Sequence, residues 1–335
     1  VFRVGEEVLT ATFEKFAPEG SVVTAAPYPV ISYKQAMLEF GSDKPDLRNP
    51  LRIVDVTDFF QRCTFKPFHG QTVRAIKVSN KMSKGFHEKL LKFATSIGMG
   101  GLGYLEVKED LSYKGPIDKF IPDDMKAEIR EIAGLKAGDT IFFIADREKQ
   151  AALYAGQLRN ELGQRLDLLE KNAYRFCFIN DFPMYEYDEE QKKIIFTHNP
   201  FSMPQGGLEA LTTKDPLELL AYQYDIVCNG VELSSGAVRN HNLDIMVKAF
   251  EIAGYTEEDL KEKFGALYNA FQYGAPPHAG MAPGVDRMIM LLRNEENIRE
   301  VIPFPMNGNA QDVMCGAPNE VSEMQLREVH IKVRK

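Results

Sequence analysis

The chain has 335 residues, enough for two domains, and its 44% hydrophobic and 26% charged residues are typical of an ordinary globular protein. Its formal net charge of -8 argues against a protein that coats nucleic acid without specificity, but leaves open a local basic surface for one RNA. No apolar run comes near the roughly 18 residues of a membrane helix, and the first residues lack the layout of a signal peptide. We therefore expect a cytoplasmic protein without a membrane span.

The cysteines and histidines argue against a zinc site. The four cysteines lie far apart, without a C-x-x-C pair, and the six histidines are scattered. We expect the cysteines to be buried thiols in a reducing compartment. They are Cys63, Cys177, Cys228 and Cys315.

The first 50 residues predict two helices and a charged loop. Apolar residues near helical spacing predict an amphipathic helix over 1–17. Because this helix begins without a capping residue, we expect the chain to be part of a longer protein. Ser32 is expected to cap a short second helix that Gly41 ends. The charged loop 40–50 is then either solvent-facing or a network that fixes a chain crossing.

The next part of the chain, 51–170, predicts a self-contained α/β unit in which no catalytic residue types gather. The predicted strands are 51–56, 73–78, 102–107 and 140–145, and the predicted helices are 84–97, 122–133 and 148–162.

From residue 175 the pattern returns to strands. Residues 175–188 and 193–197 predict a hairpin, and His198 follows its second strand. A lone histidine is usually a structural imidazole. At a strand end that faces a site, His198 could instead donate to a phosphate.

The most informative stretch is 222–239, where the Asn-Gly pair at 229–230 predicts a two-residue hairpin turn. This turn places Val227 opposite Glu232, so that Asp225 and Glu232 share one face of the sheet. Two carboxylates on one apolar face repel each other unless a cation lies between them, and Mg²⁺ with a substrate phosphate meets that need. The alternative is a hairpin with solvated charges on its open face.

If side chains alternate strictly between the two faces of the strand, Arg239 lies on the face opposite to this acidic pair. A β-bulge re-phases a strand, and bulges favour small residues and glycine. The small residues at 234–236 are therefore the expected place of a bulge that brings Arg239 to the face of Asp225 and Glu232.

A loop rich in glycine and proline, 273–284, is predicted to open into an apolar helix at about residue 285. Arg287 lies in the first turn of that helix, where a cation opposes the helix dipole. This position is easier to explain if Arg287 and the N–H groups of the turn together hold a phosphate. The alternative is a solvated arginine.

Five strings along the chain resemble one protein family. The strings are F-G-S-D-K-P-D-L-R-N-P (40–50), D-F-P-M-Y-E (181–186), H-N-P-F (198–201), N-G-V-E-L-S-S-G-A-V-R (229–239) and Y-G-A-P-P-H-A-G-M-A-P-G-V-D-R (273–287). Together, and in this order, they are similar to the bacterial aspartyl-tRNA synthetases, and the G-V-D-R of the last string resembles motif 3 of the class II synthetases.

The resemblance implies an α+β fold in which helices flank a partial class II antiparallel sheet with an inserted α/β domain. Residues 53–172 resemble the GAD domain that is inserted in the bacterial enzymes. The catalytic core would then comprise residues 1–52 and residues 173–335, the second segment with motif 3.

The resemblance also implies roles for the hairpin residues. Asp225 and Glu232 match the family's acidic pair around ATP and Mg²⁺. Arg239 matches the arginine that grips the β-carboxylate of aspartate, a bidentate task suited to guanidinium. His198 matches a histidine near the ATP phosphates and the aspartate, and Asn199 stands where some relatives have a second histidine.

In the motif 3 string, Gly284 matches the glycine that leaves room for ATP. Arg287 matches the arginine on its γ-phosphate. Catalysis by Arg287, Glu232 and Asp225 would consist of positioning and electrostatic stabilisation of a charged transition state.

The implied function is that of an aspartate–tRNA ligase: ATP-dependent activation of L-aspartate to aspartyl-adenylate and transfer to tRNA(Asp). The intact enzyme would be a homodimer, and charging of tRNA(Asn) as well stays open. The anticodon-binding domain, motif 1 and motif 2 have no counterpart in the chain. Because motif 2 supplies half of the phosphate clamp, we expect the isolated chain to form little aspartyl-adenylate.

Two other functions stay open. The chain could be a non-catalytic, synthetase-like module that binds tRNA or a partner, although such a paralogue has no physical need for the whole set of Asp225, Glu232, Arg239 and Arg287. A metal hydrolase built on the acidic pair is less favoured, because it lacks the further ligands of a two-metal site.

Overall fold

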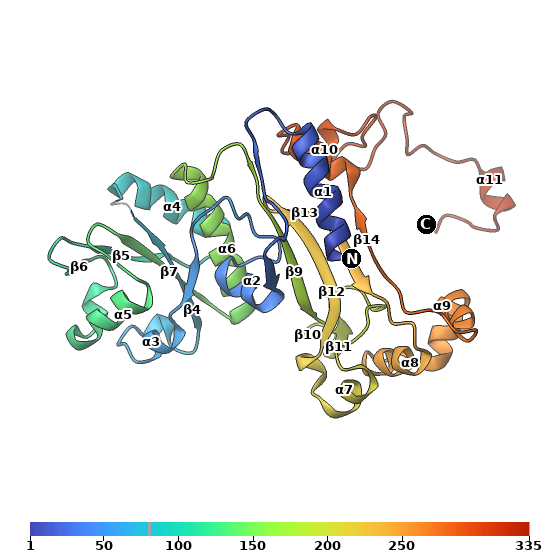
Figure 1. Cartoon of the computed structure of the whole chain (residues 1–335), viewed down its shortest axis with the longest axis horizontal. Helices are drawn as coiled ribbons and strands as arrows, with labels where there is room; N and C mark the ends of the chain where they lie inside the picture. Colours follow the sequence, from blue (N-terminus) through green and yellow to red (C-terminus); the bar gives the residue numbers. More distant parts are fainter. Residues whose placement is uncertain (80–81, 335) are drawn as a thin grey trace. The chain divides into compact units, whose positions relative to one another are not determined.

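The computed structural model describes residues 1–79 and 82–334 (Figure 1). Its helices are α1 (Phe2–Phe16), α2 (Tyr33–Glu39), α3 (Thr57–Gln61), α4 (Lys84–Ser96), α5 (Lys126–Ile132), α6 (Glu148–Arg165), α7 (Gly207–Thr213), α8 (Leu243–Ile252), α9 (Glu257–Phe271), α10 (Val285–Leu292) and α11 (Glu323–Glu328). Two strand pairs lie outside the larger sheets, namely β1 (Val22–Val23) with β8 (Ala173–Tyr174) and β10 (Tyr185–Asp188) with β11 (Lys193–Phe196).

The first large sheet has five strands in the order β14-β13-β12-β9-β2. Its pairs are antiparallel except for β2 with β9, which is parallel. Successive side chains of a strand point to opposite faces, and most residues of β9 and β12 are buried, so helices can cover both faces of the sheet. The strands are β2 (Val30–Ser32), β9 (Phe176–Pro183), β12 (Leu220–Cys228), β13 (Val231–Val238) and β14 (Ala279–Pro283).

Helices α1 and α2 contribute to opposite faces of this sheet. Phe2 of α1 stacks on Phe178 of β9, with 3.9 Å between the ring centroids. On the other face Phe40, which follows α2, packs in one core cluster with Ile179 of β9 and Val227 of β12. The face that carries Val227 is the face on which the acidic hairpin pair was expected.

The second large sheet has the strand order β3-β4-β7-β5-β6 and is covered by helices on both faces (Figure 1). One core cluster joins it to α3 and α5, and another joins it to α4 and α6. On β7 the side chain of Phe143 points into the first cluster and that of Phe142 into the second. The strands are β3 (Ile53–Asp55), β4 (Thr72–Val78), β5 (Gly103–Val107), β6 (Tyr113–Lys114) and β7 (Thr140–Asp146).

The charged loop 40–50 fixes a chain crossing against α6, which was one of the two interpretations of its sequence. Arg159 of α6 is 1% exposed and donates to the backbone carbonyls of Asp46, Asn49 and Leu51. Burial lowers the pKa of Arg159 to about 10, so the guanidinium stays charged at neutral pH. Its charge is therefore satisfied by carbonyl oxygens of the loop.

The α+β class with an antiparallel sheet flanked by helices is confirmed. The expected start of the last helix is also confirmed, because α10 begins at Val285. The expectation of a loop over 273–284 is wrong in part, since Ala279–Pro283 forms strand β14 at an end of the sheet. An end strand needs only one row of ladder hydrogen bonds, so it tolerates a proline.

The cysteine prediction is correct for Cys63, Cys177 and Cys228, which are buried, and wrong for Cys315, which is exposed. Cys315 lies in the second of two compact units, residues 284–335, which also contains α10 and α11. The domain boundaries at residues 52 and 172 stay a prediction. Within the described residues, no helix has the length and apolar character needed to cross a membrane.

Candidate active site

The hairpin of β12 and β13 has the register that its Asn-Gly turn predicts. Cys228 pairs with Val231 and Val227 pairs with Glu232, while Asn229 adopts a left-handed φ of 53°. Asp225 lies two residues before Val227 on β12 and therefore projects to the same face as Glu232. Asp225 is 4% exposed. The structure thus brings the two predicted carboxylates onto one face, and it buries one of them.

A β-bulge re-phases β13, but its position differs from the prediction. Val227 pairs with Glu232 whereas Ile226 pairs with Ser234, so Leu233 is the extra residue. The expected site at 234–236 is wrong: these residues pair in regular register with 224–226. Leu233 is 1% exposed, and burying this large side chain next to the turn fixes the bulge there.

The bulge has the predicted consequence for Arg239. Ser235 pairs with Asp225, so strict alternation from Ser235 places Arg239 on the face of the acidic pair. A strand advances about 3.3 Å per residue, which puts Arg239 roughly 13 Å along the strand from Ser235. The carboxylates and the guanidinium therefore lie toward opposite ends of one wall.

Lys44 is a candidate site residue that the sequence interpretation missed. Its Nζ lies 2.7 Å from Oδ2 of Asp43 and 3.4 Å from Oε2 of Glu232. Burial alone would lower the pKa of Lys44, but the hydrogen bond to Asp43 and the charges of Asp43, Glu232 and Asp225 raise it above its ordinary value. The ammonium is therefore charged at neutral pH and sits beside the acidic pair.

His198 follows β11 and lies within range of the charges of Lys44 and Glu232. Its ring packs edge-on against Phe182 at 5.0 Å and against Tyr33 at 6.3 Å between centroids. Burial against these rings lowers the pKa of His198, and the charges of Lys44 and Glu232 also act on it. His198 is thus a neutral imidazole at pH 7, able to donate one hydrogen bond to an anionic ligand.

Asn199, the neighbour of His198, has local backbone contacts. Its side-chain oxygen accepts from the N–H of Phe201, and its own N–H donates to the side-chain oxygen of Gln223 at 3.4 Å. These contacts fix the chain after β11. They do not by themselves indicate a ligand.

Arg239 lines a cavity of about 230 Å³. The cavity also offers the imidazole of His278 and the side-chain amide of Asn240, which is 1% exposed. Neither atom of that amide has a hydrogen-bond partner among the described protein atoms. A buried amide normally has partners, so the cavity is suited to a polar ligand or ordered water. Its other lining residues are Phe201, Leu267 and Phe271.

Gly284 and Arg287 lie in the compact unit 284–335. Gly284 is the N-cap residue of α10, and Arg287 is in the first turn, as the sequence predicted. Asp286, in the same turn, has the charge that the helix dipole favours.

A metal ion at the hairpin would need ligands beyond the protein. Among the residues that the structure describes, no group of three or more His, Cys, Asp or Glu side chains could hold a metal ion. Mg²⁺ is commonly held by one or two carboxylates together with substrate phosphates and water. The pair Asp225 and Glu232 fits such a shared site.

Comparison with known proteins identifies the family. The family model of the tRNA synthetases class II (D, K and N) matches residues 1–308. The chain belongs to this family. Three curated relatives extend the match over almost the whole chain, and each bears the name of an aspartate–tRNA ligase.

The aspartate–tRNA(Asp/Asn) ligase of Zymomonas mobilis is 54% identical over 340 residues, covering 99% of this chain and 57% of that protein. The ligase of the same name from Ehrlichia canis is 50% identical and covers 100% and 58% of the two chains. The aspartate–tRNA ligase of Streptomyces coelicolor is 52% identical and covers 100% and 57%. The chain therefore spans somewhat more than half the length of these class II relatives.

Among solved structures, the aspartyl tRNA synthetase from Entamoeba histolytica matches 72% of this chain and 44% of its own, at 18% identity and a TM-score of 0.32. At this score the match adds nothing to the argument. Family membership rests on the class II family model and on the curated relatives.

Proposed function

We propose that this chain supplies part of the active site of an aspartate–tRNA ligase, which activates L-aspartate with ATP to aspartyl-adenylate and transfers it to tRNA(Asp). The observation that carries the proposal is the hairpin wall, with Asp225 and Glu232 toward one end and Arg239 toward the other on one face. Membership of the class II family and relatives named as aspartate–tRNA ligases support it.

The acidic end of the wall would bind the nucleotide. Glu232 and Asp225 would hold Mg²⁺ together with ATP phosphates, and the ion would neutralise charge that develops on those phosphates. Lys44, at 3.4 Å from Glu232, would stabilise the same phosphates once they approach. The neutral His198 would donate a hydrogen bond to a phosphate or to aspartate.

The other end of the wall would bind the amino acid. Arg239 can donate two parallel hydrogen bonds to the β-carboxylate of aspartate in a bidentate pair. The buried amide of Asn240 and the imidazole of His278 line the same cavity and could complete the recognition. Asn199 would act through the chain that it fixes between His198 and Phe201.

The motif 3 residues are proposed to bind ATP as well. Gly284, without a side chain, would leave room for the nucleotide, and Arg287 would bind the γ-phosphate. Removing any residue that binds the phosphates in this way reduces transition-state stabilisation.

The proposed partners follow the same logic. Relatives from Zymomonas mobilis and Ehrlichia canis are named for tRNA(Asp/Asn), and that from Streptomyces coelicolor for tRNA alone, so charging of tRNA(Asn) is included as a second substrate. The active form would be a homodimer in the cytoplasm. Residues 53–172 would form the inserted GAD domain on the sheet β3-β4-β7-β5-β6.

A chimera tests the function in a complete context. This chain would replace the matched part of the Zymomonas mobilis ligase, which covers 57% of that protein. We expect aspartate-dependent exchange of pyrophosphate into ATP by the chimera, and little exchange by the isolated 335-residue chain. A well-folded chimera without exchange would instead favour the second candidate, a non-catalytic module that binds tRNA or a partner.

A further inference from the structure

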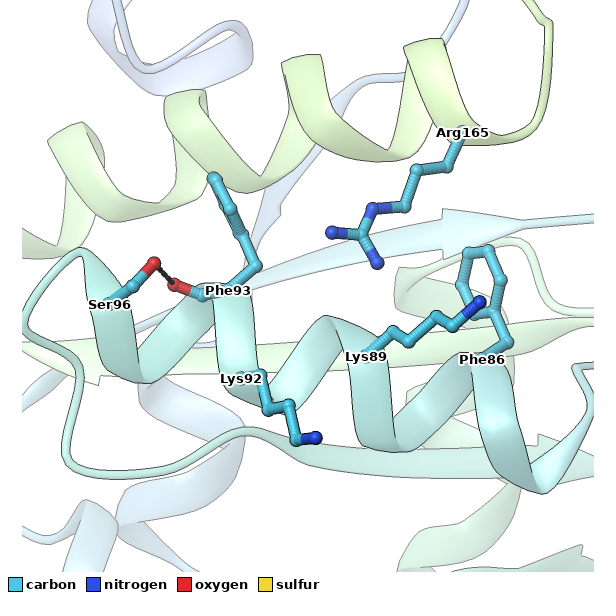
Figure 2. A pocket seen from close by; sticks show the side chains of 6 residues that line it. All are labelled: Phe86, Lys89, Lys92, Phe93, Ser96 and Arg165. Carbon is cyan, nitrogen blue, oxygen red and sulfur yellow. Dashed lines mark hydrogen bonds between the residues drawn. The ribbon is translucent and has the colours of Figure 1, made fainter.

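A basic groove lies in the part of the chain that the proposed aspartate and ATP sites do not use. It has a volume of about 750 Å³ and runs between α4 and the end of α6. Figure 2 shows Arg165 extending from α6 toward α4, into the space between Phe86 and Phe93. The groove is lined by Phe86, Lys89, Lys92, Phe93, Ser96 and Arg165.

Five of these lining residues occupy one side of α4. Phe86, Lys89, Phe93 and Ser96 recur at intervals of three or four residues, and Lys92 lies one turn after Lys89, which keeps all five within one face of a helix. The adjacent face carries Leu90 and Ala94, which are 0% exposed and pack in the core between α4, α6 and the sheet. The core therefore holds α4 in place, and the groove is a fixed surface.

The two lysines of the groove are available to an anion. Lys89 and Lys92 are exposed, and neither has an ion-pair partner within residues 1–79 and 82–334. Glu88 of the same helix pairs with Lys84 instead. The third cation, Arg165, pairs with Glu161, one turn earlier on α6, and its side chain extends toward α4 (Figure 2). A positive surface of this kind stands out on a chain of net charge -8.

Two aromatic rings line the groove together with these cations. Phe86 and Phe93 are half-buried at the edge of the core (Figure 2). A combination of cations and partly exposed rings is typical of surfaces that bind single-stranded or looped nucleic acid, where the cations bind phosphates and a base stacks on a ring. An acidic peptide would use the cations but not the aromatic faces.

We propose that this groove binds the phosphate backbone of the tRNA substrate, with an unpaired base against Phe86 or Phe93. This inference rests on the proposed function for the identity of the RNA. The groove would add a second contact region for tRNA, separate from the hairpin wall, and its contribution would be salt-dependent.

Binding of a fluorescein-labelled tRNA(Asp) transcript to the 335-residue chain tests the proposal. Fluorescence anisotropy would give Kd across a range of about 50–300 mM KCl, in which phosphate contacts are salt-sensitive. For Lys89→Ala/Lys92→Ala we expect Kd to rise about fivefold or more near 100 mM, and the slope of log K against log salt to fall in magnitude by about two.

A matched control removes the same charge elsewhere. Lys248→Ala/Lys261→Ala changes two lysines that pair with Glu251 and Glu257 on α8 and α9. For this control we expect the slope of log K against log salt to stay close to that of the unchanged chain. Phe93→Leu keeps an apolar side chain in the core but removes the ring, and is expected to weaken binding about fivefold without changing the slope.

Two results would overturn the proposal. One is the absence of tRNA binding by the unchanged chain at the lowest salt, and the other is an equal effect of both double substitutions on Kd and slope. The pyrophosphate-exchange assay of the chimera is carried out without tRNA. Absence of exchange in that assay would therefore count against the ligase function alone.

Discussion

His198 shows how a single environment decides the chemistry of a residue. Packing against Phe182 and Tyr33 lowers its pKa, although Asp43 and Glu232 act in the opposite direction. Because the pKa is lower in the folded chain than in the unfolded chain, the fold is favoured while the imidazole is neutral. That contribution is lost as the pH falls from about 6.5 toward the folded pKa.

We therefore predict that the imidazole of His198 titrates below the ordinary value of about 6.5. Two-dimensional NMR of the histidine side chains across about pH 4.5 to 8, a range that brackets the ordinary value, would measure the midpoint. His198→Gln removes one resonance and so assigns it. A midpoint at or above the ordinary value would contradict the placement of the ring against Phe182.

The sequence indicated some site residues and concealed others. Asp225, Glu232 and Arg239 stood out because charges are unusual in an apolar hairpin pattern. Lys44 did not, since its partner Glu232 lies far along the chain and only the fold brings them to 3.4 Å. Asn240 resembled an ordinary residue after a strand, and only its burial distinguishes it.

At the scale of elements, the crossing between α6 and the loop after α2 depends on two glycines. Gly41 has a φ of +65°, and a Cβ there would lie 2.2 Å from the carbonyl oxygen of Ala152 and 2.5 Å from the backbone nitrogen of Gly156. Both neighbours are backbone atoms of α6, which cannot move aside without distorting that helix.

We predict that Gly41→Ala lowers the free energy of unfolding by about 3 kcal/mol. Urea unfolding followed by circular dichroism would measure the loss. Gly85→Ala is the matched control, because no atom of the described residues would lie within 4 Å of a Cβ at that position and α4 tolerates alanine. Equal stability of both variants would show that the crossing is not tightly packed.

The hairpin shows what local sequence can and cannot determine. Its register was predictable because an Asn-Gly turn fixes which residues face each other. The need for a bulge was also predictable from the phase of Arg239. The position of the bulge was not predictable, because the burial of Leu233 determines it. The small residues at 234–236 pair in regular register.

For the whole molecule, the sheet β3-β4-β7-β5-β6 carries core clusters on both of its faces. A sheet with two covered faces has the burial that independent folding requires. The sequence predicted four of its strands, β3, β4, β5 and β7, and its long helices from apolar runs. It missed β6, which has only two residues and is defined by pairing with β5.

We predict that residues 53–172 fold as a separate protein, with a cooperative urea transition whose m-value is about 1–3 kcal/mol/M. A longer form, 40–172, should be more stable because it restores the carbonyls that Arg159 binds. A non-cooperative transition in both forms would contradict the domain boundaries.

The same hairpin wall is proposed to bind aspartate at Arg239 and nucleotide at Glu232 with Asp225. Measuring KM for aspartate and for ATP in the active chimera separates the two ends. Arg175→Lys, a change at an arginine paired with Glu170, serves as the control for general effects of an arginine substitution.

For Arg239→Lys we predict a rise of about tenfold or more in KM for aspartate with little change for ATP, since a charged hydrogen bond contributes about 1.5–3 kcal/mol. For Glu232→Gln we predict the reverse: the KM for ATP rises at limiting Mg²⁺, and the KM for aspartate changes little. Equal rises in both KM values for both variants would contradict a wall with two separate ends.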